Sequence, residues 1–317
     1  INTGVVGIFY PPSPLKSQIL FNNLYWKEAK LMKTNRMSNL NRIFTRNMLR
    51  HFINGKVDSV YSSVVRRYTH DADQKNNRKL ICEIYCELKN TYRNEYFYKN
   101  TLLNKLLLGV HSVNTTTALT EIAIAKSKAD FLLINGKAVV YEIKTELDNL
   151  ERLSSQLDDY YKAFDHVAVV TYEKNLPQLQ KVLKSIDKPV GIYILRRNGK
   201  LATVRKPQRY TVDLDREVIF KLLRKSEYEE IITQRYGYLP EVTQFKYYSA
   251  CKKMFLQIPV EESYLLVLKI LKKRMQLEKE EFVKIPYELK FLAYFMELTH
   301  DDYRKLETFL ECQYGGE

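Results

Sequence analysis

The chain has 317 residues, of which 45% are hydrophobic, and it carries a formal net charge of +14. This length is enough for two or three domains with a full hydrophobic core, which excludes a small scaffold held by disulfides. The positive charge favours polyanionic partners, nucleic acid first, and the plainer explanation is a generally basic, solvated surface. No run of about 18 apolar residues occurs, so we expect no membrane partner and a cytoplasmic protein.

The first part of the chain shows mainly helical periodicity. Residues 1–36 are predicted to be irregular because prolines interrupt them. Since the chain opens at Ile1, we expect a trimmed protein or an upstream extension, with Met37 as an alternative start. Apolar residues recur at helical spacing over residues 39–68 and again after a polar loop. The sequence therefore predicts an N-terminal, mostly helical region over residues 1–92.

Strands and helices alternate in the middle of the chain, between residues 115 and 205. The expected elements are a strand at 117–126, a hairpin within 129–146, a helix at 148–164, a strand at 166–172, a helix at 177–186 and a strand at 190–197. Asp148 and Glu151 are expected to cap the first of these helices as a capping box. With one helix before the strands, this order predicts an α/β core with a mixed central sheet over residues 93–210.

The remainder of the chain, residues 211–317, is again helical in pattern. Its amphipathic segments are residues 216–226, 228–236, 263–282, 288–298 and 301–312. We expect these segments to form one C-terminal helical domain. Together with the N-terminal region, this domain is expected to recognise substrate, to mediate homodimerisation or to dock a protein partner.

The predicted hairpin at Asn135-Gly136 carries charged residues on otherwise apolar strands. Two apolar runs flank this dipeptide, and Asp130 stands at the start of the first run. The second run ends in Glu142 and Lys144, which point to the same side because strand side chains alternate. A charge at the end of an apolar stripe is costly in a core and useful for holding a metal ion.

The two carboxylates of this hairpin can act together only if they project from the same face. A two-residue turn at Asn135-Gly136 would put Glu142 on the opposite face from Asp130, and the metal-site hypothesis would fail. A three-residue loop that includes Ile134, with Gly136 in the left-handed conformation, puts both carboxylates on one face. We therefore predict a bulged hairpin with this loop, or a bulge near Asp130.

Phosphodiester hydrolysis needs a divalent cation held by oxygen ligands, a positioned water, and a group that activates this water or neutralises the transition state. Asp130 and Glu142 on neighbouring strands can hold the cation, and the carbonyl of Ile143 is a natural further ligand. Lys144 lies on the same face, within reach of the attacking water. Mg²⁺ is the expected metal, with Mn²⁺ as its substitute.

With these residues the chain resembles the PD-(D/E)xK nuclease superfamily over residues 90–205. The resemblance rests on Asp130, on Glu142 and Lys144 at a strand end, and on the order of the elements. Ala129 stands where the name of the superfamily has Pro, a position that varies within it. The resemblance implies a restriction-endonuclease-like core, metal ligation by Asp130 and Glu142, and water activation or transition-state support by Lys144.

Two residues of the next helix extend the resemblance. Gln156 and Tyr160 are similar to the Q-x-x-x-Y motif of the RecB-like branch, in which these residues line the active site and help to bind the nucleic acid strand. Tyr160 also fits the apolar stripe of its helix, so core packing is the alternative role. The superfamily supplies a further glutamate from its first helix. Glu95 matches that position, and Glu121 is the second candidate.

Basic residues flank the predicted site. Lys126 and Lys128 lie on the turn before Asp130, where they are expected to bind the phosphates of a substrate. Further cations gather at the last predicted strand, namely Arg196, Arg197, Lys200 and Arg205. A solvated basic rim is the plainer explanation for these residues.

The sequence as a whole predicts a Mg²⁺-dependent endonuclease that acts on nucleic acid, DNA rather than RNA, with phage or mobile-element defence as its setting. The alternative is a catalytically silent module on the same fold that binds nucleic acid or another protein. The trio of Asp130, Glu142 and Lys144 argues against a silent module. Charged side chains on an apolar stripe cost free energy through lost solvation, and a silent module does not need them. A phosphate-ester enzyme acting on nucleotides would instead have a closed pocket.

Overall fold

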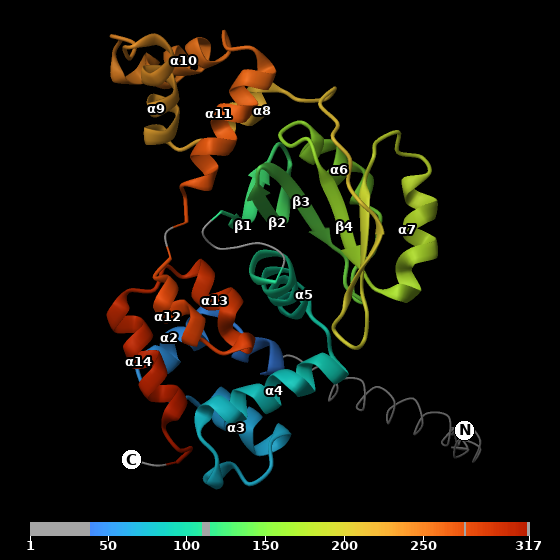
Figure 1. Cartoon of the computed structure of the whole chain (residues 1–317), viewed down its shortest axis with the longest axis vertical. Helices are drawn as coiled ribbons and strands as arrows, with labels where there is room; N and C mark the ends of the chain where they lie inside the picture. Colours follow the sequence, from blue (N-terminus) through green and yellow to red (C-terminus); the bar gives the residue numbers. More distant parts are fainter. Residues whose placement is uncertain (1–38, 110–114, 276, 316–317) are drawn as a thin grey trace, which may run out of the picture.

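The computed structural model describes residues 39–109, 115–275 and 277–315. A six-stranded sheet lies at the centre of the molecule, with helices against its faces and a helical part beyond each end (Figure 1). The chain is therefore a mixed α/β protein, as the alternation of strands and helices predicts. The irregular segment expected over residues 1–36, with its alternative start at Met37, lies outside the described residues.

The strands follow one another across the sheet in chain order, β1-β2-β3-β4-β5-β6. They are β1 (Thr117–Ile124), β2 (Ser127–Asn135), β3 (Lys137–Ile143), β4 (Val167–Thr171), β5 (Gly191–Leu195) and β6 (Leu201–Arg205). β3, β4 and β5 run parallel, and the other neighbouring pairs are antiparallel. β6 is absent from the predicted elements because its side chains are half-buried or exposed, which leaves no buried apolar run in its sequence.

The hairpin of β2 and β3 has an odd-length loop, as the metal-site hypothesis requires. Asn135 pairs with Lys137, so Gly136 stands alone at the tip, with the left-handed φ of 68° that is predicted for it. The predicted loop begins one residue too early, because Ile134 pairs with Ala138 inside the ladder. The two-residue turn is therefore excluded.

The register beyond the tip decides which residues stand opposite each other. The last pair before the charged positions is Phe131 with Tyr141. One step further along both strands, Asp130 stands level with Glu142. Both carboxylates therefore reach the same end of the hairpin, whereas a shift by one residue would have separated them.

Three helices cover the faces of the sheet. α5 (Glu95–Leu102), continued by a π-helical stretch (Leu103–Leu108), shares a core with the face that carries Phe131. α6 (Leu153–Tyr161) and α7 (Leu176–Leu183) share a core with the opposite face. The sheet is thus buried on both sides, which agrees with the apolar character of its central strands.

α6 begins at Leu153, later than predicted. Asp148 does not cap it, because its Oδ2 accepts hydrogen bonds from the N–H and the hydroxyl of Thr145, at 2.8 and 2.7 Å. Asp148 therefore closes a turn directly after β3, and Arg152 occupies the N-cap position of the helix. The capping box predicted with Glu151 is wrong, because a local turn competes for the same carboxylate.

The helical parts do not follow the predicted division of the chain. One part consists of α8 (Arg216–Lys221), α9 (Lys225–Tyr236), α10 (Gln244–Phe255) and α11 (Val260–Lys272). The other contains α2 (Arg46–Ile53), α3 (Ser59–Tyr68), α4 (Asn77–Thr91), α12 (Lys279–Lys284), α13 (Lys290–Phe295) and α14 (His300–Glu311). Short 3₁₀ helices are η1 (Ala72–Gln74), η3 (Glu173–Asn175) and η4 (Tyr287–Leu289).

Residues 211–317 are thus divided between two cores instead of forming one C-terminal domain. α8–α11 share a core with α6 and α7, whereas α12–α14 pack with the N-terminal helices. The rings of Phe52 and Phe309 stack there with centroids 4.7 Å apart, and Arg78 binds both carboxylate oxygens of Glu307 at 2.8 Å. Among the described residues, no helix combines the length and apolar character needed to cross a bilayer.

Candidate functional site

Glu142, at the end of β3, is a buried carboxylate with three side-chain partners. Gln156 donates from Nε2 to its Oε1 at 2.6 Å, and the hydroxyl of Tyr160 donates to its Oε2 at 2.6 Å. Lys144 Nζ lies 2.9 Å from Glu142 Oε1 and donates to Gln156 Oε1 at 2.8 Å. The side chain of Glu142 is only 3% exposed, so its ion pair with Lys144 is buried. Hydrogen bonds from Gln156 and Tyr160 to the carboxylate, and from Lys144 to Gln156, compensate for the water that these buried groups have lost.

The local fold explains why these side chains meet. Glu142 and Lys144 lie on the same face at the end of β3, and the N–H of Lys144 donates to the carbonyl of Val170 in β4 at 2.9 Å. α6 follows β3 in the chain and packs on that face. Gln156 and Tyr160 stand one helical turn apart, so both reach the same carboxylate.

Asp130 lies beside this cluster. Its Oδ2 accepts a hydrogen bond from the N–H of Ile143 at 2.8 Å. The carbonyl of Ile143 is the predicted metal ligand, whereas the contact with Asp130 is made by the N–H of the same residue. Burial, and after it the negative charge of Glu142, raise the pKa of Asp130 to about 7. Burial and the charge of Glu142 disfavour the ionised form of Asp130, and a cation bound nearby would stabilise that form.

Both candidates for the further glutamate lie next to Asp130. One carboxylate oxygen from each of Glu95, Glu121 and Asp130 lies within 4.8 Å of the others. Glu95 is the first residue of α5, and Glu121 lies in β1 across from Asp130. The sequence predicts one of the two glutamates at the site, and the packing of α5 against the sheet brings in both.

A lysine that the sequence analysis does not select lies among these carboxylates. Lys99 Nζ is 2.5 Å from Glu95 Oε1 and also contacts Glu121 Oε1. Burial alone would lower the pKa of Lys99, but the two glutamates outweigh it and raise the pKa. Lys128 Nζ binds the other oxygen of Glu121 at 2.5 Å. The spacing of Glu95 and Lys99, one turn apart on a helix, is the sequence signal that indicates this pair.

Glu121 has a left-handed backbone conformation in the middle of a strand. Its φ is 57°, and the ladder between β1 and β2 has no pair at this position. A residue with a Cβ atom adopts this conformation at a cost of about 1–2 kcal/mol, and such strain is typical of functional positions. The predicted bulge near Asp130 concerns the hairpin of β2 and β3, whose ladder is regular, whereas the irregularity at Glu121 lies in β1 and was not predicted.

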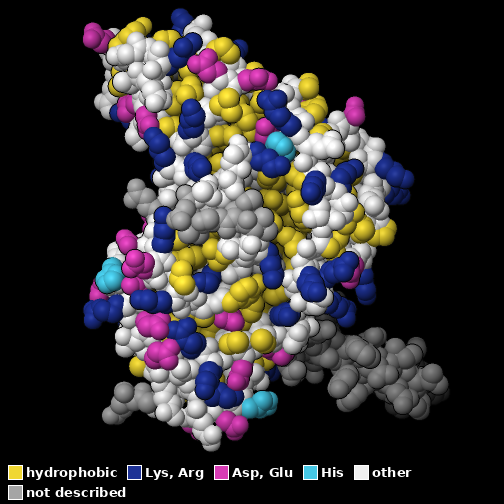
Figure 2. Space-filling model, viewed as in Figure 1, with side chains coloured by type: hydrophobic (Ala, Val, Ile, Leu, Met, Phe, Trp, Pro, Cys, Tyr) yellow, Lys and Arg dark blue, Asp and Glu magenta, His cyan; other side chains and the backbone are white. Residues whose placement is uncertain are grey.

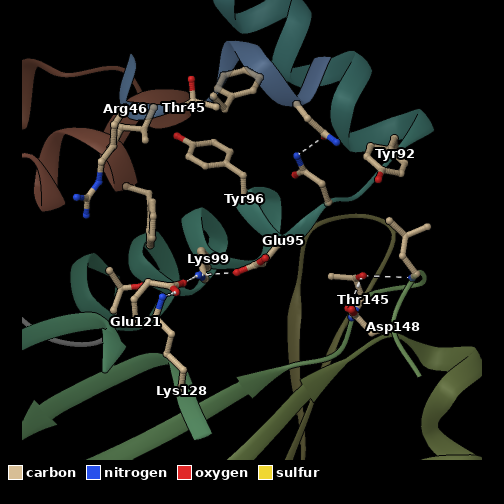
Figure 3. Close-up of a pocket in the computed structure, with 17 residues that line it drawn as sticks. Thr45, Arg46, Tyr92, Glu95, Tyr96, Lys99, Glu121, Lys128, Thr145 and Asp148 are labelled. Carbon is tan, nitrogen blue, oxygen red and sulfur yellow. Dashed lines mark hydrogen bonds and ion pairs between the residues drawn. The ribbon is translucent and has the colours of Figure 1, made fainter. Parts of the chain in front are cut away.

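Two of these carboxylates, Glu95 and Glu121, line a cleft of about 720 Å³ (Figure 3), whereas Asp130, Glu142 and Lys144 are not among its lining residues. Glu121 and Lys128 line it from β1 and β2, and Glu95 and Lys99 line it from α5. The remaining walls come from residues 41–46, α13 and the loop after β3. Segments from both ends of the chain therefore enclose the site.

The four residues predicted to bind substrate take different places. Gln156 and Tyr160 hold the carboxylate of Glu142 and are not among the residues that line the cleft, and Tyr160 is fully buried. Lys128 lines the cleft, whereas Lys126 is exposed on the turn between β1 and β2 and does not line it. Tyr160 thus packs in the core, as the alternative role predicts, and its hydroxyl contacts Glu142. Its contact with nucleic acid stays a prediction.

The donor set suits a divalent cation of the magnesium class. Carboxylate oxygens are the ligands that Mg²⁺ and Mn²⁺ prefer, and three of them lie within reach of one ion. The raised pKa of Asp130 indicates negative charge that is not fully compensated. Lys99 neutralises part of this charge, so an incoming ion would displace its ammonium group from Glu95 or Glu121.

Comparison with known proteins places the chain in a phage protein family. The family model described as bacteriophage P4 protein cII matches residues 88–292. Protein cII of Enterobacteria phage P4 is 27% identical over 147 residues, which is 45% of this chain and 50% of that protein. The chain thus spans about half the length of this curated relative.

A solved structure is also similar, though distantly. A protein of unknown function from Silicibacter pomeroyi matches with a TM-score of 0.26 and 13% identity, over 39% of this chain and 82% of that one. The family match is far more extensive, because it runs from the end of α4 through the sheet to α13. More than half of the sequence is covered in this way, and the chain therefore belongs to the bacteriophage P4 protein cII family.

Proposed function

We propose that this protein is a divalent-metal-dependent nuclease with a restriction-endonuclease-like core of the PD-(D/E)xK type. One observation carries the proposal: Asp130 stands level with Glu142 at the end of a hairpin, and Lys144 contacts Glu142 from the same strand. These are the positions that the resemblance to the superfamily singles out. Gln156 and Tyr160, from the following helix, bind the same carboxylate.

Asp130, Glu95 and Glu121 would hold the cation, because one carboxylate oxygen from each lies within 4.8 Å of the others. Glu95 and Glu121 also line the cleft, and Glu142 lies near enough to Asp130 to raise its pKa. A bound Mg²⁺ would supply a water of lowered pKa and would neutralise charge on the phosphate. The strained backbone of Glu121 supports a functional role for its carboxylate, since strain of this kind is retained where it serves a site.

Lys144 would act on the reacting phosphate or on the attacking water. Its Nζ is held by Glu142 Oε1 at 2.9 Å and by Gln156 Oε1 at 2.8 Å. A donor fixed in this way can stabilise charge that develops in the transition state without first reorganising. Gln156 and Tyr160 would orient Glu142, and through it Lys144.

Nucleic acid is the substrate class that the surface supports. The net charge is +14, and Lys and Arg side chains are spread over the whole face shown in Figure 2. Around the sheet in this view basic side chains outnumber acidic ones, as the electrostatic recognition of a phosphate backbone requires. We propose DNA before RNA, with phage or mobile-element biology as the setting.

A second candidate function has one observation in its favour. Lys99 is an internal cation that already pairs with Glu95 and contacts Glu121. A protein whose carboxylates are neutralised by its own lysine could bind nucleic acid or another protein without cleaving anything. The buried pair of Glu142 and Lys144 favours the nuclease, because a binding module gains nothing from it.

Nicking of a supercoiled plasmid in Mg²⁺ or Mn²⁺ tests the proposal. We expect Glu142→Gln and Lys144→Met to lower the rate at least a hundredfold. Lys137→Met is the matched control, because Lys137 is exposed at the tip of the same hairpin, and its rate should stay within about twofold of the parent. Cleavage that survives both site changes would exclude this site, and a parent that binds DNA without cutting it would favour the silent module.

A further inference from the structure

We infer that the cleft takes an unpaired polynucleotide strand and excludes a duplex, an inference that rests on the proposed nucleic-acid substrate of the same site. The strand would pass the carboxylates of the cleft and continue beyond the loop that follows β3. The inference comes from the walls of the cleft, from a second cleft that adjoins it, and from the cations at the two ends.

The cleft has walls on several sides. Its volume is about 720 Å³, and it is bordered by β1 and β2, by α5, by residues 41–46 and by α13. A single strand can turn its bases toward such walls, whereas the bases of a duplex are stacked and paired inside the double helix. Glu142 and Lys144 are not among the residues that line the cleft, and their side chains are only 3% and 10% exposed. A scissile phosphate would therefore have to come close to the sheet, beside Glu95 and Glu121, to approach them.

The wall opposite the sheet is packed in a way that resists widening. Phe44 stacks on Tyr96 with ring centroids 5.0 Å apart, and Phe291 meets Tyr96 edge-on at 5.8 Å. The hydroxyl of Tyr96 donates to the carbonyl of Glu288 at 2.5 Å. The segment around Phe44, α5 and the segment around α13 are thus joined through one tyrosine, and this wall would have to unpack to admit a duplex.

A second cleft of about 560 Å³ continues from the first, and the two share Tyr92 and Leu147. Leu147 is 63% exposed on the loop after β3, although its side chain is apolar. Tyr92, directly after α4, is half-buried and lines both clefts. An aromatic ring and an exposed apolar side chain at such a junction suit the faces of unstacked bases, which a duplex does not offer.

Cations stand at both ends of this path. Arg46 lines the first cleft, and Lys89 and Arg197 line the second. Arg93 also lines the second cleft, but its guanidinium already donates a hydrogen bond to the carbonyl of Leu195 and forms an ion pair with Glu146. Phosphates on either side of the carboxylates would therefore meet basic side chains, and the scissile phosphate would lie between them.

Fluorescence anisotropy with the parent protein in EDTA tests the inference separately from cleavage. The probes are a labelled 20-nucleotide single strand and the duplex of the same sequence, each prepared as DNA and as RNA. We expect a single strand to bind at least tenfold more tightly than its duplex. The affinities for the DNA and the RNA single strand, compared with each other, show whether the cleft prefers deoxyribose or ribose. Equal or tighter binding of both duplexes would overturn the inference.

Variants of the path give a second test. Tyr92→Ala should weaken single-strand binding about tenfold, and Tyr92→Phe should restore it, because stacking needs the ring and not the hydroxyl. Lys89→Ala with Arg197→Ala should lower the slope of log Kd against log salt by about 1.4, the value for two lost phosphate contacts. The control, Arg66→Ala with Lys137→Ala, removes the same charge from exposed positions outside both clefts.

Unchanged binding in both path variants, or an equal loss in the control, would overturn the inference. These outcomes differ from a failure of the proposed function. A protein that prefers single strands but never cleaves them would contradict the nuclease and leave the inference in place. A protein that cleaves duplex and single strand equally well would contradict the inference alone.

Discussion

The hydroxyl of Tyr160 donates a hydrogen bond of 2.6 Å to Oε2 of Glu142, and both side chains are buried. Burial, and after it the charge of Glu142, raise the pKa of Tyr160, so the phenol stays protonated and remains a donor. The adjacent Tyr161 is equally buried, yet its hydroxyl has no hydrogen-bond partner among the described residues. Neighbouring tyrosines on one helix thus differ in whether the hydroxyl supports a buried charge.

This difference predicts opposite results for the same substitution. Tyr160→Phe leaves a buried carboxylate short of a donor, so we expect it to lower the free energy of unfolding by about 1–3 kcal/mol. Tyr161→Phe removes an unpartnered hydroxyl and should leave the stability unchanged or raise it slightly. Urea denaturation of both variants measures the two effects. Equal losses would show that the hydrogen bond to Glu142 contributes nothing specific.

Asp130→Asn should stabilise the metal-free protein at neutral pH. The pKa of Asp130 is about 7 in the folded protein and 3.8 ordinarily, so the folded state binds more protons than the unfolded state between these values. Parent stability therefore falls as pH rises from about 4 to about 7 and stays lower above that range. The stability of the asparagine variant should not fall in this way, because asparagine does not ionise. It also retains an oxygen that can accept from the N–H of Ile143.

The stability gained by Asp130→Asn should be near zero at pH 4 and reach about 2 kcal/mol at pH 8. This is less than the full pKa shift would give, because Asp130 is partly exposed. Urea denaturation in EDTA across this pH range measures the difference between variant and parent. A gain that is constant with pH would contradict the raised pKa.

The same pKa predicts how metal affinity depends on pH. A carboxylate must be ionised to bind a cation, so Mn²⁺ affinity should fall up to tenfold per unit as pH drops below about 7. Isothermal titration calorimetry between pH 5.5 and 8.5 measures this dependence. With Asp130→Asn the dependence in this range should flatten and the affinity should be weaker throughout. An affinity in the parent that does not change over this range would remove Asp130 from the ligands.

Lys99→Met tests the competition between lysine and metal ion. Without its ammonium, Glu95 and Glu121 repel each other, so the metal-free variant should be less stable than the parent, and Mn²⁺ should bind about tenfold more tightly. The rise in Tm on adding Mn²⁺ should exceed that of the parent. Lys128→Met is the control, because Lys128 also pairs with Glu121 but is 61% exposed, and its effect should be smaller.

If Lys99→Met binds Mn²⁺ with the affinity of the parent and shows the same rise in Tm, Lys99 does not compete with the metal ion for the carboxylates. A lower metal affinity in the variant would mean that Lys99 helps to assemble the site instead. Either result would also bear on the silent module, which depends on Lys99 as a permanent counter-ion.

Local periodicity in the sequence is sufficient to predict part of the fold and part of the site. Side chains alternate along a strand, so Glu142 and Lys144 had to share a face, and an odd-length loop at Gly136 was needed to bring Asp130 level with them. Helical spacing likewise put Gln156 and Tyr160 one turn apart after the hairpin. The α/β class followed from the order of strands and helices.

Tertiary structure alone decided what depends on contacts between distant segments. Glu95 and Glu121 are both at the site because α5 packs against the sheet, and Lys99 enters it from the same helix. Residues 41–46 and α13 meet over the carboxylates because the two ends of the chain share one core. Periodicity shows which face of an element is buried but not which partner buries it, so the cleft could not be predicted. The spacing of Glu95 and Lys99 indicates that the two residues pair, but not that Lys99 also meets Glu121 at the site.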